Sequence, residues 1–304
     1  MRRLRDRLDR IEAGINERLP GPLKIGALTL YWYSTRTSTH VDRLADRPGW
    51  RRWSDAAVAT LVAVQVAGIA LIAVAAIQAL GQQRATALND PVNTVAIPGL
   101  NAFMPLSATP YIVLALVVAT VVHEGGHAVA CRAADVSVEE WGVALLFGIV
   151  PLAGYVLPGE ELDAAPLWAQ LRVYSIGVFH NLWVAVLALA VLLLPVTAAP
   201  RTAFVAYFGW AVVGGTPPTA ATVAQLGVLT NAAFWLALLN ANFGLLNALP
   251  ISALDGGRVL SLLLTHLDRA TPVDLSPRTH WLALHGASVA VITLVVLAIL
   301  GPAL

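Results

Sequence analysis

The sequence predicts an all-α polytopic membrane protein with about five to six transmembrane helices and one re-entrant or β-like loop. Of its 304 residues, 58% are hydrophobic and only 12% are charged, whereas about 25% of the residues in a soluble globular domain are charged. Four apolar runs are each about 20 residues long, which is the length that crosses a bilayer. A fifth run is interrupted by asparagines and a proline. We therefore expect the lipid bilayer as the chain's surroundings, and no nucleic-acid partner.

The first element is a basic N-terminal segment, residues 1–55. It contains twelve of the 19 Lys and Arg residues before position 54. We interpret it as a cytoplasmic amphipathic segment that lies at the membrane surface, although a merely solvated basic tail explains residues 1–25 equally well. Acidic residues interrupt its basic run, and no short apolar region with a cleavage site follows, so we do not expect a cleavable signal peptide.

Residues 56–304 form the predicted membrane-embedded part. Its continuous spans are residues 56–80, 111–131, 173–195 and 281–300, and the interrupted one is 232–253. Residues 141–157 are uncharged but short and are broken by Gly148, Pro151 and Gly154, which predicts a re-entrant or strand-like loop against the helices. Residues 203–228 have two glycines and two prolines at their centre. Because proline interrupts a helix, we do not expect this segment to cross the membrane.

The distribution of positive charge predicts the orientation. With the N-terminus in the cytoplasm and five crossings, seventeen of the 19 basic residues lie on the cytoplasmic side, and only Arg84 and Arg201 lie outside. This is the asymmetry that the positive-inside rule describes. Arginine is abundant and Lys24 is the single lysine, which together with abundant alanine suggests a prokaryotic cell membrane.

Three ionisable residues lie inside the second span, in the motif HEGGH. His123 and His127 are four residues apart and so share one face of a helix, where both imidazoles can bind one metal ion. Zinc suits such a site because it accepts imidazole and carboxylate ligands and leaves a position for water. Glu124 is placed to take a proton from that water. The alternative is a buried polar cluster that joins helices, but burying three ionisable groups in hydrocarbon without a metal is costly.

Asp255 is the candidate for the third protein ligand. It follows an apolar stretch in which Pro250 breaks the helix, and Gly256 after it allows close backbone approach. The alternative is an ion pair with Arg258 at the membrane surface. For Asp255 to reach the depth of HEGGH, its helix must run in the same direction as the second span, which requires one net crossing between them. Residues 173–195 supply that crossing, in agreement with the charge distribution.

The two motifs together resemble the site-2 proteases, which are intramembrane zinc metalloproteases. The family pairs HExxH with an Asn-x-x-Pro…Leu-Asp-Gly pattern, which NALPISALDGG at residues 247–257 matches. The resemblance extends over most of residues 30–265, because three further stretches are similar: residues 31–53, IPGLN (97–101) and GVFHNLWVA (177–185). These stretches resemble the branch of the family that contains the eukaryotic sterol-pathway enzyme. The resemblance implies the following site: His123, His127 and Asp255 bind one zinc ion, Glu124 activates water, and Asn247 and Asn181 stabilise the substrate carbonyl or its oxyanion. Packing between helices is the alternative role for both asparagines.

The function implied is hydrolysis of a peptide bond within or near the transmembrane segment of a membrane protein, for example a membrane-tethered transcription regulator, with the active site toward the cytoplasm. An unwound substrate strand could pair with the irregular loop at 141–157. A non-catalytic zinc-binding receptor or scaffold is an alternative, against which the intact Glu124 speaks. Another HExxH membrane protease would need an intramembrane glutamate as third ligand, and the later spans offer none. A transporter would distribute its ionisable residues through several spans.

Some features depart from the family pattern. About 35 residues separate the third span from the aspartate helix, too few for the PDZ-like domain found there in many members, and we expect no C-terminal regulatory domain. Cys131 is the only cysteine, so no intramolecular disulfide and no cysteine-based zinc site is expected. His180 points away from its neighbour Asn181 and is not predicted to be a ligand. The two glycines of HEGGH each reduce helix stability by roughly 1 kcal/mol, and we interpret them as room for another backbone near the metal.

Overall fold

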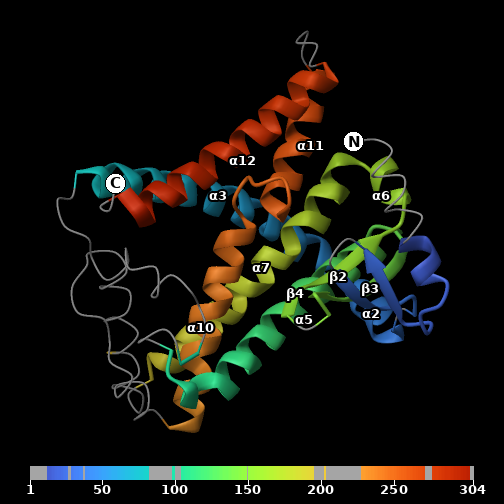
Figure 1. The fold of residues 1–304 in the computed structure, drawn as a ribbon. Coiled ribbons are helices and arrows are strands. Elements are labelled where there is room, and N and C mark those ends of the chain that lie inside the picture. Colours follow the sequence, from blue (N-terminus) through green and yellow to red (C-terminus); the bar gives the residue numbers. More distant parts are fainter. Residues whose placement is uncertain are drawn as a thin grey trace.

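Five helices long and apolar enough to span a membrane dominate the computed structural model (Figure 1). The structure describes residues 12–26, 29–36, 38–81, 98–99, 104–148, 150–194, 202, 227–270 and 276–301. The long helices are α3 (Trp50–Leu80), α5 (Thr109–Ala133, preceded by the 3-10 turn η2, Leu106–Ala108), α7 (Leu167–Leu192), α10 (Val228–Asn247) and α12 (Pro277–Leu300). Three shorter helices are α2 (Thr39–Ala45), α6 (Glu161–Ala164) and α11 (Asp255–Ala270). The predicted helical membrane class is confirmed.

The helix ends follow local chemistry. The first span begins at Trp50, six residues before the expected start, directly after Gly49, which has the left-handed φ of 100° that glycine tolerates. The interrupted span was expected to reach residue 253, but α10 ends at Asn247 because Pro250 cannot continue it. Residues 248–254 are therefore non-helical, and α11 begins directly at Asp255.

The helices α5, α7 and α10 form the centre of the bundle, and a core of Ile112, Ala115, Leu192, Phe234 and Trp235 fills the space between them. Half of the most apolar stretch of α7 and of α10 is buried, against 17% for α3 and 11% for α12. Helices α3 and α12 pack on each other and turn their remaining apolar surface outward, as lipid-facing helices do.

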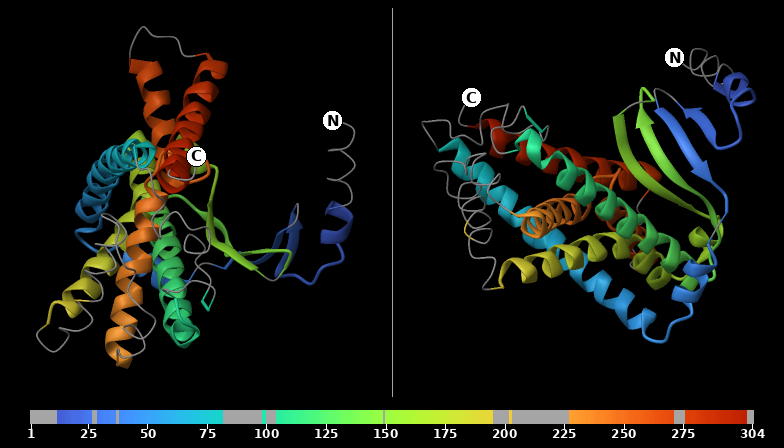
Figure 2. Two further views of the ribbon diagram at one scale, coloured as in Figure 1. Left: turned by 60° about the vertical axis from the view of Figure 1, so that its left-hand side comes forward. Right: turned by 90° about the horizontal axis from the view of Figure 1, so that it is seen from below.

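The central helices alternate in direction. In Figures 1 and 2, α5 and α10 run the same way through the bundle, and α7, which packs against both, runs in the opposite direction. The end of α7 and the start of α10 lie at the same end of the bundle. The C-terminal half of α5 and the C-terminal end of α10, which leads to Asp255, are therefore at one level of the bundle. This is the arrangement expected if Asp255 is to reach the depth of HEGGH. The segment 203–228, expected not to cross, lies outside the described residues apart from its last two positions.

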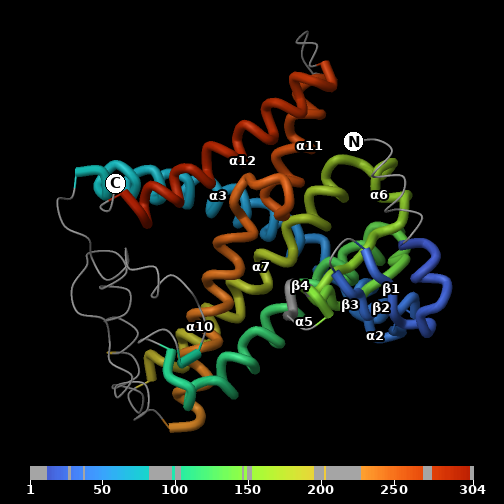
Figure 3. The backbone as a smooth tube through the Cα atoms, viewed as in Figure 1, coloured from blue at the N-terminus to red at the C-terminus, as the bar shows by residue number. Residues whose placement is uncertain are grey.

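A four-stranded antiparallel sheet lies beside the bundle (Figure 3). The expected strand-like loop is a hairpin of β3 (Val138–Leu146) and β4 (Val150–Pro158). Two further strands, β1 (Leu23–Gly26) and β2 (Thr29–Ser34), come from the N-terminal segment and complete the order β1-β2-β3-β4. This segment therefore does more than lie at the membrane surface. Its TLYWYS run has the aromatic and alternating character of a strand, but its partner β3 lies more than 100 residues away, so no local pattern announces the pairing.

Polar side chains join all four strands on one face of the sheet. The Lys24 ammonium lies 2.6 Å from Glu140 Oε1 and between 5.2 and 5.8 Å from three tyrosine ring centres. Tyr155 of β4 donates its hydroxyl to the same Glu140 carboxylate. The pKa of the Tyr155 hydroxyl is raised above its usual range, mainly because the group is removed from water and secondly because it donates this hydrogen bond. The position of β4 is thus connected to the N-terminal strand.

Candidate metal centre

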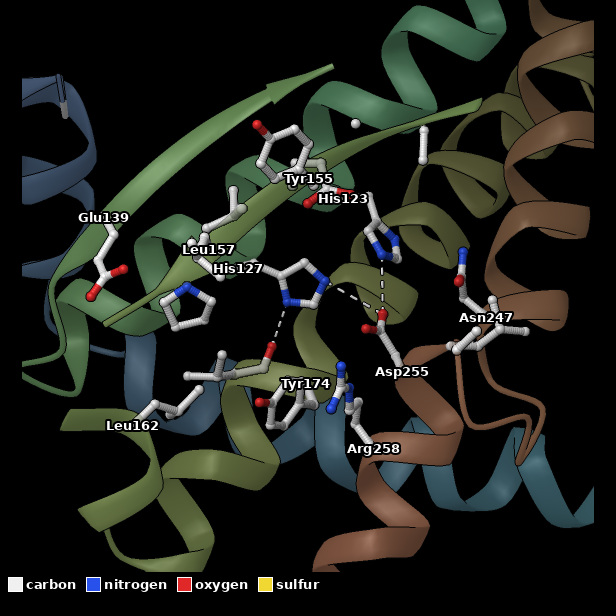
Figure 4. Close-up of a pocket in the computed structure, with 18 of the residues that line it drawn as sticks. His123, His127, Glu139, Tyr155, Leu157, Leu162, Tyr174, Asn247, Asp255 and Arg258 are labelled. Atoms are coloured by element: carbon white, nitrogen blue, oxygen red, sulfur yellow. Dashed lines mark hydrogen bonds and ion pairs between the residues drawn. The ribbon is translucent and has the colours of Figure 1, made fainter. Parts of the chain in front are cut away.

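Three ligand-type side chains that are distant in sequence meet between α5 and the start of α11 (Figure 4). His123 Nε2 lies 3.0 Å and His127 Nε2 lies 3.4 Å from Asp255 Oδ2. The candidate ligand atoms lie within 4.8 Å of one another, and both histidines are buried. The structure therefore brings together the three residues that the sequence predicted as metal ligands.

Hydrogen bonds on the far side of each imidazole determine which nitrogen faces Asp255. His127 Nδ1 lies 2.6 Å from the carbonyl oxygen of Val173, and His123 Nδ1 lies 2.6 Å from Asn181 Oδ1. The Asn181 amide nitrogen donates to the Ala119 carbonyl (2.9 Å) and to the side-chain oxygen of Asn240 (3.0 Å), so its Oδ1 is an acceptor. Both Nδ1 atoms must therefore donate, and in the neutral rings both Nε2 atoms present a lone pair.

These lone pairs fit a metal ion. Asp255 Oδ2 is buried and, judged by hydrogen-bond geometry, has no donor among the described residues. Two lone pairs and a buried carboxylate oxygen that face one another need extra protons or a cation between them. Two imidazoles and one carboxylate are a donor set that zinc accepts in a tetrahedral shell with one open position. The outer hydrogen bonds orient the rings in the way that partners of zinc-binding histidines do.

Gly177 of α7 lines the site closely, which the sequence pattern alone does not indicate. A Cβ atom at this position would lie 2.7 Å from the Nε2 atoms of both His123 and His127. Only a glycine therefore lets the backbone of α7 lie against the two imidazoles. The GVFHN stretch begins with this residue, but nothing in its local pattern shows what it contacts.

The two glycines within HEGGH have different surroundings. A Cβ on Gly126 would lie 2.7 Å from Nδ1 of His180, whereas a Cβ on Gly125 would meet nothing within 4 Å. The expected close neighbour is thus a side-chain ring rather than a backbone. His180 Nδ1 lies 3.1 Å from the carbonyl oxygen of Val122, to which it donates, and its Nε2 accepts from the Trp53 indole at 3.0 Å. Both nitrogens of His180 are engaged outside the triad, which leaves neither to bind the metal.

Glu124 borders a cavity of about 610 Å³ that also contains the triad. Its side chain packs against β4, where a Cβ on Gly154 would lie 3.0 Å from Glu124 Cγ. None of the described residues forms a hydrogen bond or ion pair with its carboxylate, which is half-buried. The cavity wall includes residues 153–158 of β4, and β4 is an edge strand among the described strands. A carboxylate and a strand edge therefore face the same space as the candidate metal ligands.

The two predicted asparagines occupy different places. Asn247, the last residue of α10, lines the cavity beside Asp255 (Figure 4). Asn181 is fully buried and does not line the cavity, and its amide group is occupied by His123, Ala119 and Asn240. In this position the Asn181 amide contacts a candidate metal ligand, and its contact with a substrate carbonyl stays a prediction. Asn240, which accepts from the Asn181 amide, lies two helical turns before Asn247 and is one of the asparagines that interrupt this span.

The alternative pairing of Asp255 is not observed. Within the described part of the chain, the Asp255 carboxylate lies against the two imidazoles and forms no ion pair with Arg258. The Arg258 side chain instead extends along the cavity near Tyr174 (Figure 4).

A bundle of membrane-spanning helices around a buried His–His–Asp donor set defines a class: a polytopic membrane protein with a candidate metal site suited to hydrolysis. Beside that site lies the Glu124 carboxylate, which has no hydrogen-bond partner among the described residues. The chain belongs to peptidase family M50, whose family model matches residues 111–293, and it is thus a member of a metalloprotease family. It is 31% identical over 96 residues to the "Membrane-bound transcription factor site-2 protease homolog" of Arabidopsis thaliana. That alignment covers 31% of this chain and 18% of the relative, so the match spans less than a fifth of the relative's length. No solved structure matches. The predicted relationship to the site-2 proteases is confirmed.

Proposed function

We propose that this protein is an intramembrane zinc metalloprotease that hydrolyses a peptide bond within or near the transmembrane segment of a membrane protein. The observation that supports this most directly is the convergence of His123, His127 and Asp255 in one cavity with Glu124, whose carboxylate no described residue pairs with. These three ligands would hold zinc, which when bound supplies Lewis-acid activation of a water molecule and of the substrate carbonyl.

Glu124 would act as general base and then as general acid. Its carboxylate takes a proton from the attacking water as the new carbon–oxygen bond forms. It then delivers that proton to the amide nitrogen as the carbon–nitrogen bond breaks, so that a carboxyl group and an amine are released. The Asn247 amide, which lines the same cavity, is placed to donate a hydrogen bond to the carbonyl oxygen while negative charge develops on it.

The substrate would bind as an extended strand along the edge of β4. A helical segment hides its carbonyl groups in its own hydrogen bonds, so it must unwind before it can be cut. The edge of β4, with which none of the described strands pairs, offers backbone donors and acceptors to an unwound segment, and residues 153–158 line the cavity that Glu124 borders. A membrane-tethered transcription regulator is the proposed kind of substrate, in line with the name of the Arabidopsis relative.

The proposed setting is a prokaryotic cell membrane, with the N-terminus and the open side of the metal site in the cytoplasm. The distribution of basic residues around the five spans supports the orientation, and the abundance of arginine and alanine with a single lysine supports the prokaryotic setting. Cysteines introduced one at a time into the loops, with the buried Cys131 as the only native thiol, would report the orientation by labelling from each side. If a cysteine introduced at position 17 is labelled from the outside, the proposed orientation is wrong.

The test of the function compares Glu124→Gln with the wild-type protein on a model transmembrane substrate. We expect the variant to keep its zinc and to lose cleavage by about 10²- to 10⁴-fold, the range for loss of general acid–base catalysis. Asp255→Ala should lose both zinc and cleavage. Glu17→Gln, which changes an exposed carboxylate of the N-terminal segment, is the control and should cleave normally. Undiminished cleavage by Glu124→Gln would refute the mechanism, and an inactive wild-type protein that binds zinc would favour the scaffold alternative.

A further inference from the structure

The segment that leads to Asp255 has no regular structure of its own. Helix α10 ends at Asn247 and α11 begins at Asp255, and residues 248–254 between them are non-helical. The segment folds tightly against the first turn of α11, because a Cβ on Gly256 would lie 2.1 Å from the Ala248 carbonyl oxygen. The position of the Asp255 carboxylate therefore depends on the path of this segment.

Gln65, near the middle of α3, connects the two ends of the segment. Its side-chain nitrogen donates to the Ala248 carbonyl oxygen at 2.9 Å and to the Gly256 carbonyl oxygen at 3.0 Å. One amide group thus holds the backbone on both sides of the non-helical stretch, and Gly256 is the direct neighbour of Asp255. Gln65 is only 8% exposed, although most of the surrounding helix faces outward.

Ser288 of α12 contacts the same segment. Its hydroxyl oxygen accepts from the Ser252 backbone N–H at 2.9 Å and donates to the Leu284 carbonyl of its own helix at 2.9 Å. Ser288 is buried, whereas most of α12 is exposed. The two outer helices therefore each direct a buried polar side chain at residues 248–256.

We infer that Gln65 and Ser288 are positioning residues that hold Asp255 at the distance from His123 and His127 that a metal ion requires. Polar side chains on outward-facing membrane helices are costly unless they are paired, and both of these are paired with this one segment. The inference rests on the proposed metal site, but it does not depend on peptidase activity. Neither residue touches the triad, so both act through the backbone that carries Asp255.

The experiment measures metal binding by the purified full-length protein in competition with a chelator. In Gln65→Met, a side chain of similar length without a hydrogen-bond donor replaces the amide. We expect its dissociation constant for Zn²⁺ to rise about 10- to 100-fold, as for other groups that support metal ligands. Ser288→Ala should show a smaller rise in the same direction. With Co²⁺ in place of Zn²⁺, the visible absorption bands of both variants should shift because the carboxylate ligand is displaced.

Ser54→Ala is the matched control. Ser54 is the other buried polar residue that α3 contains in the described structure, but its hydroxyl donates only to Trp50 of the same helix. It should bind metal as the wild type does. An unchanged dissociation constant and Co²⁺ spectrum in both Gln65→Met and Ser288→Ala would overturn the inference. So would an equal loss of affinity in Ser54→Ala, which would indicate general destabilisation. If Asp255→Ala keeps its metal, the proposed metal site itself is wrong. This failure is distinguishable from a failure of the positioning inference, because Asp255→Ala tests the ligand directly and involves neither Gln65 nor Ser288.

Discussion

Replacing Asn181 by leucine separates two roles that this residue could have. The change removes three hydrogen bonds of the buried amide, at 2.6 Å to His123, 2.9 Å to Ala119 and 3.0 Å to Asn240. Hydrogen bonds between membrane helices average about 0.6 kcal/mol each, so we expect the folded protein to lose about 2 kcal/mol of stability. The imidazole of His123 also loses the acceptor that fixes its tautomer, which should weaken zinc binding about 10- to 100-fold.

The assay is the zinc dissociation constant of the purified protein, measured together with kcat and KM at saturating zinc. An orienting role predicts weaker zinc binding and a kcat that largely recovers when zinc is in excess. A direct contact with the substrate oxyanion predicts the reverse: unchanged zinc affinity and a kcat lower by about 10²- to 10³-fold. Asn242→Leu is the control, since Asn242 is exposed and donates only within α10. Unchanged zinc affinity in Asn181→Leu would refute the structural argument.

Two further predictions use glycines near the site. Gly177→Ala should abolish zinc binding without unfolding the protein, because its Cβ would lie 2.7 Å from both imidazole Nε2 atoms. At Gly125 an added Cβ has open space, so Gly125→Ala should keep zinc and gain about 1 kcal/mol of stability. Zinc content and thermal unfolding check both variants, and normal zinc binding by Gly177→Ala would contradict the geometry. Gly154→Ala should reduce cleavage but leave zinc affinity unchanged, because the added Cβ lies 2.4 Å from Thr120 Cγ2 and displaces β4 from α5. Adding Thr120→Ala removes that methyl group and should restore part of the cleavage rate, and a double variant no better than the single one would speak against this contact.

Local patterns were sufficient for the spans and the triad, and insufficient for the contacts around them. Apolar runs predicted all five spans, with the largest errors at the ends next to Gly49, Pro166 and Pro250. HEGGH and Asp255 could be combined because the charge distribution constrained the direction of the helices. Gln65 and Gly177 have no local signature, because each acts on residues that are distant in sequence and only the packed bundle brings them together.

The N-terminal strands were missed for a related reason. A run such as TLYWYS is compatible with a strand, but pairing needs a partner, and β3 lies on the far side of two spans. The basic composition of the segment predicted a membrane-surface location and concealed this possibility. Non-local strand pairing of this kind cannot be derived from the periodicity of either strand alone.

The edge of β4 also implies a requirement on the length of any substrate. Six residues of β4, 153–158, line the cavity, and a strand of six residues extends over roughly 20 Å. The same six residues in a helix occupy about 9 Å. Pairing along this edge would therefore lengthen a membrane-spanning segment by about 11 Å, which is a third of the roughly 30 Å hydrocarbon core. A substrate that is anchored on both sides of the bilayer cannot accommodate this additional length. The geometry therefore favours membrane-spanning segments with at least one end that can move into the membrane.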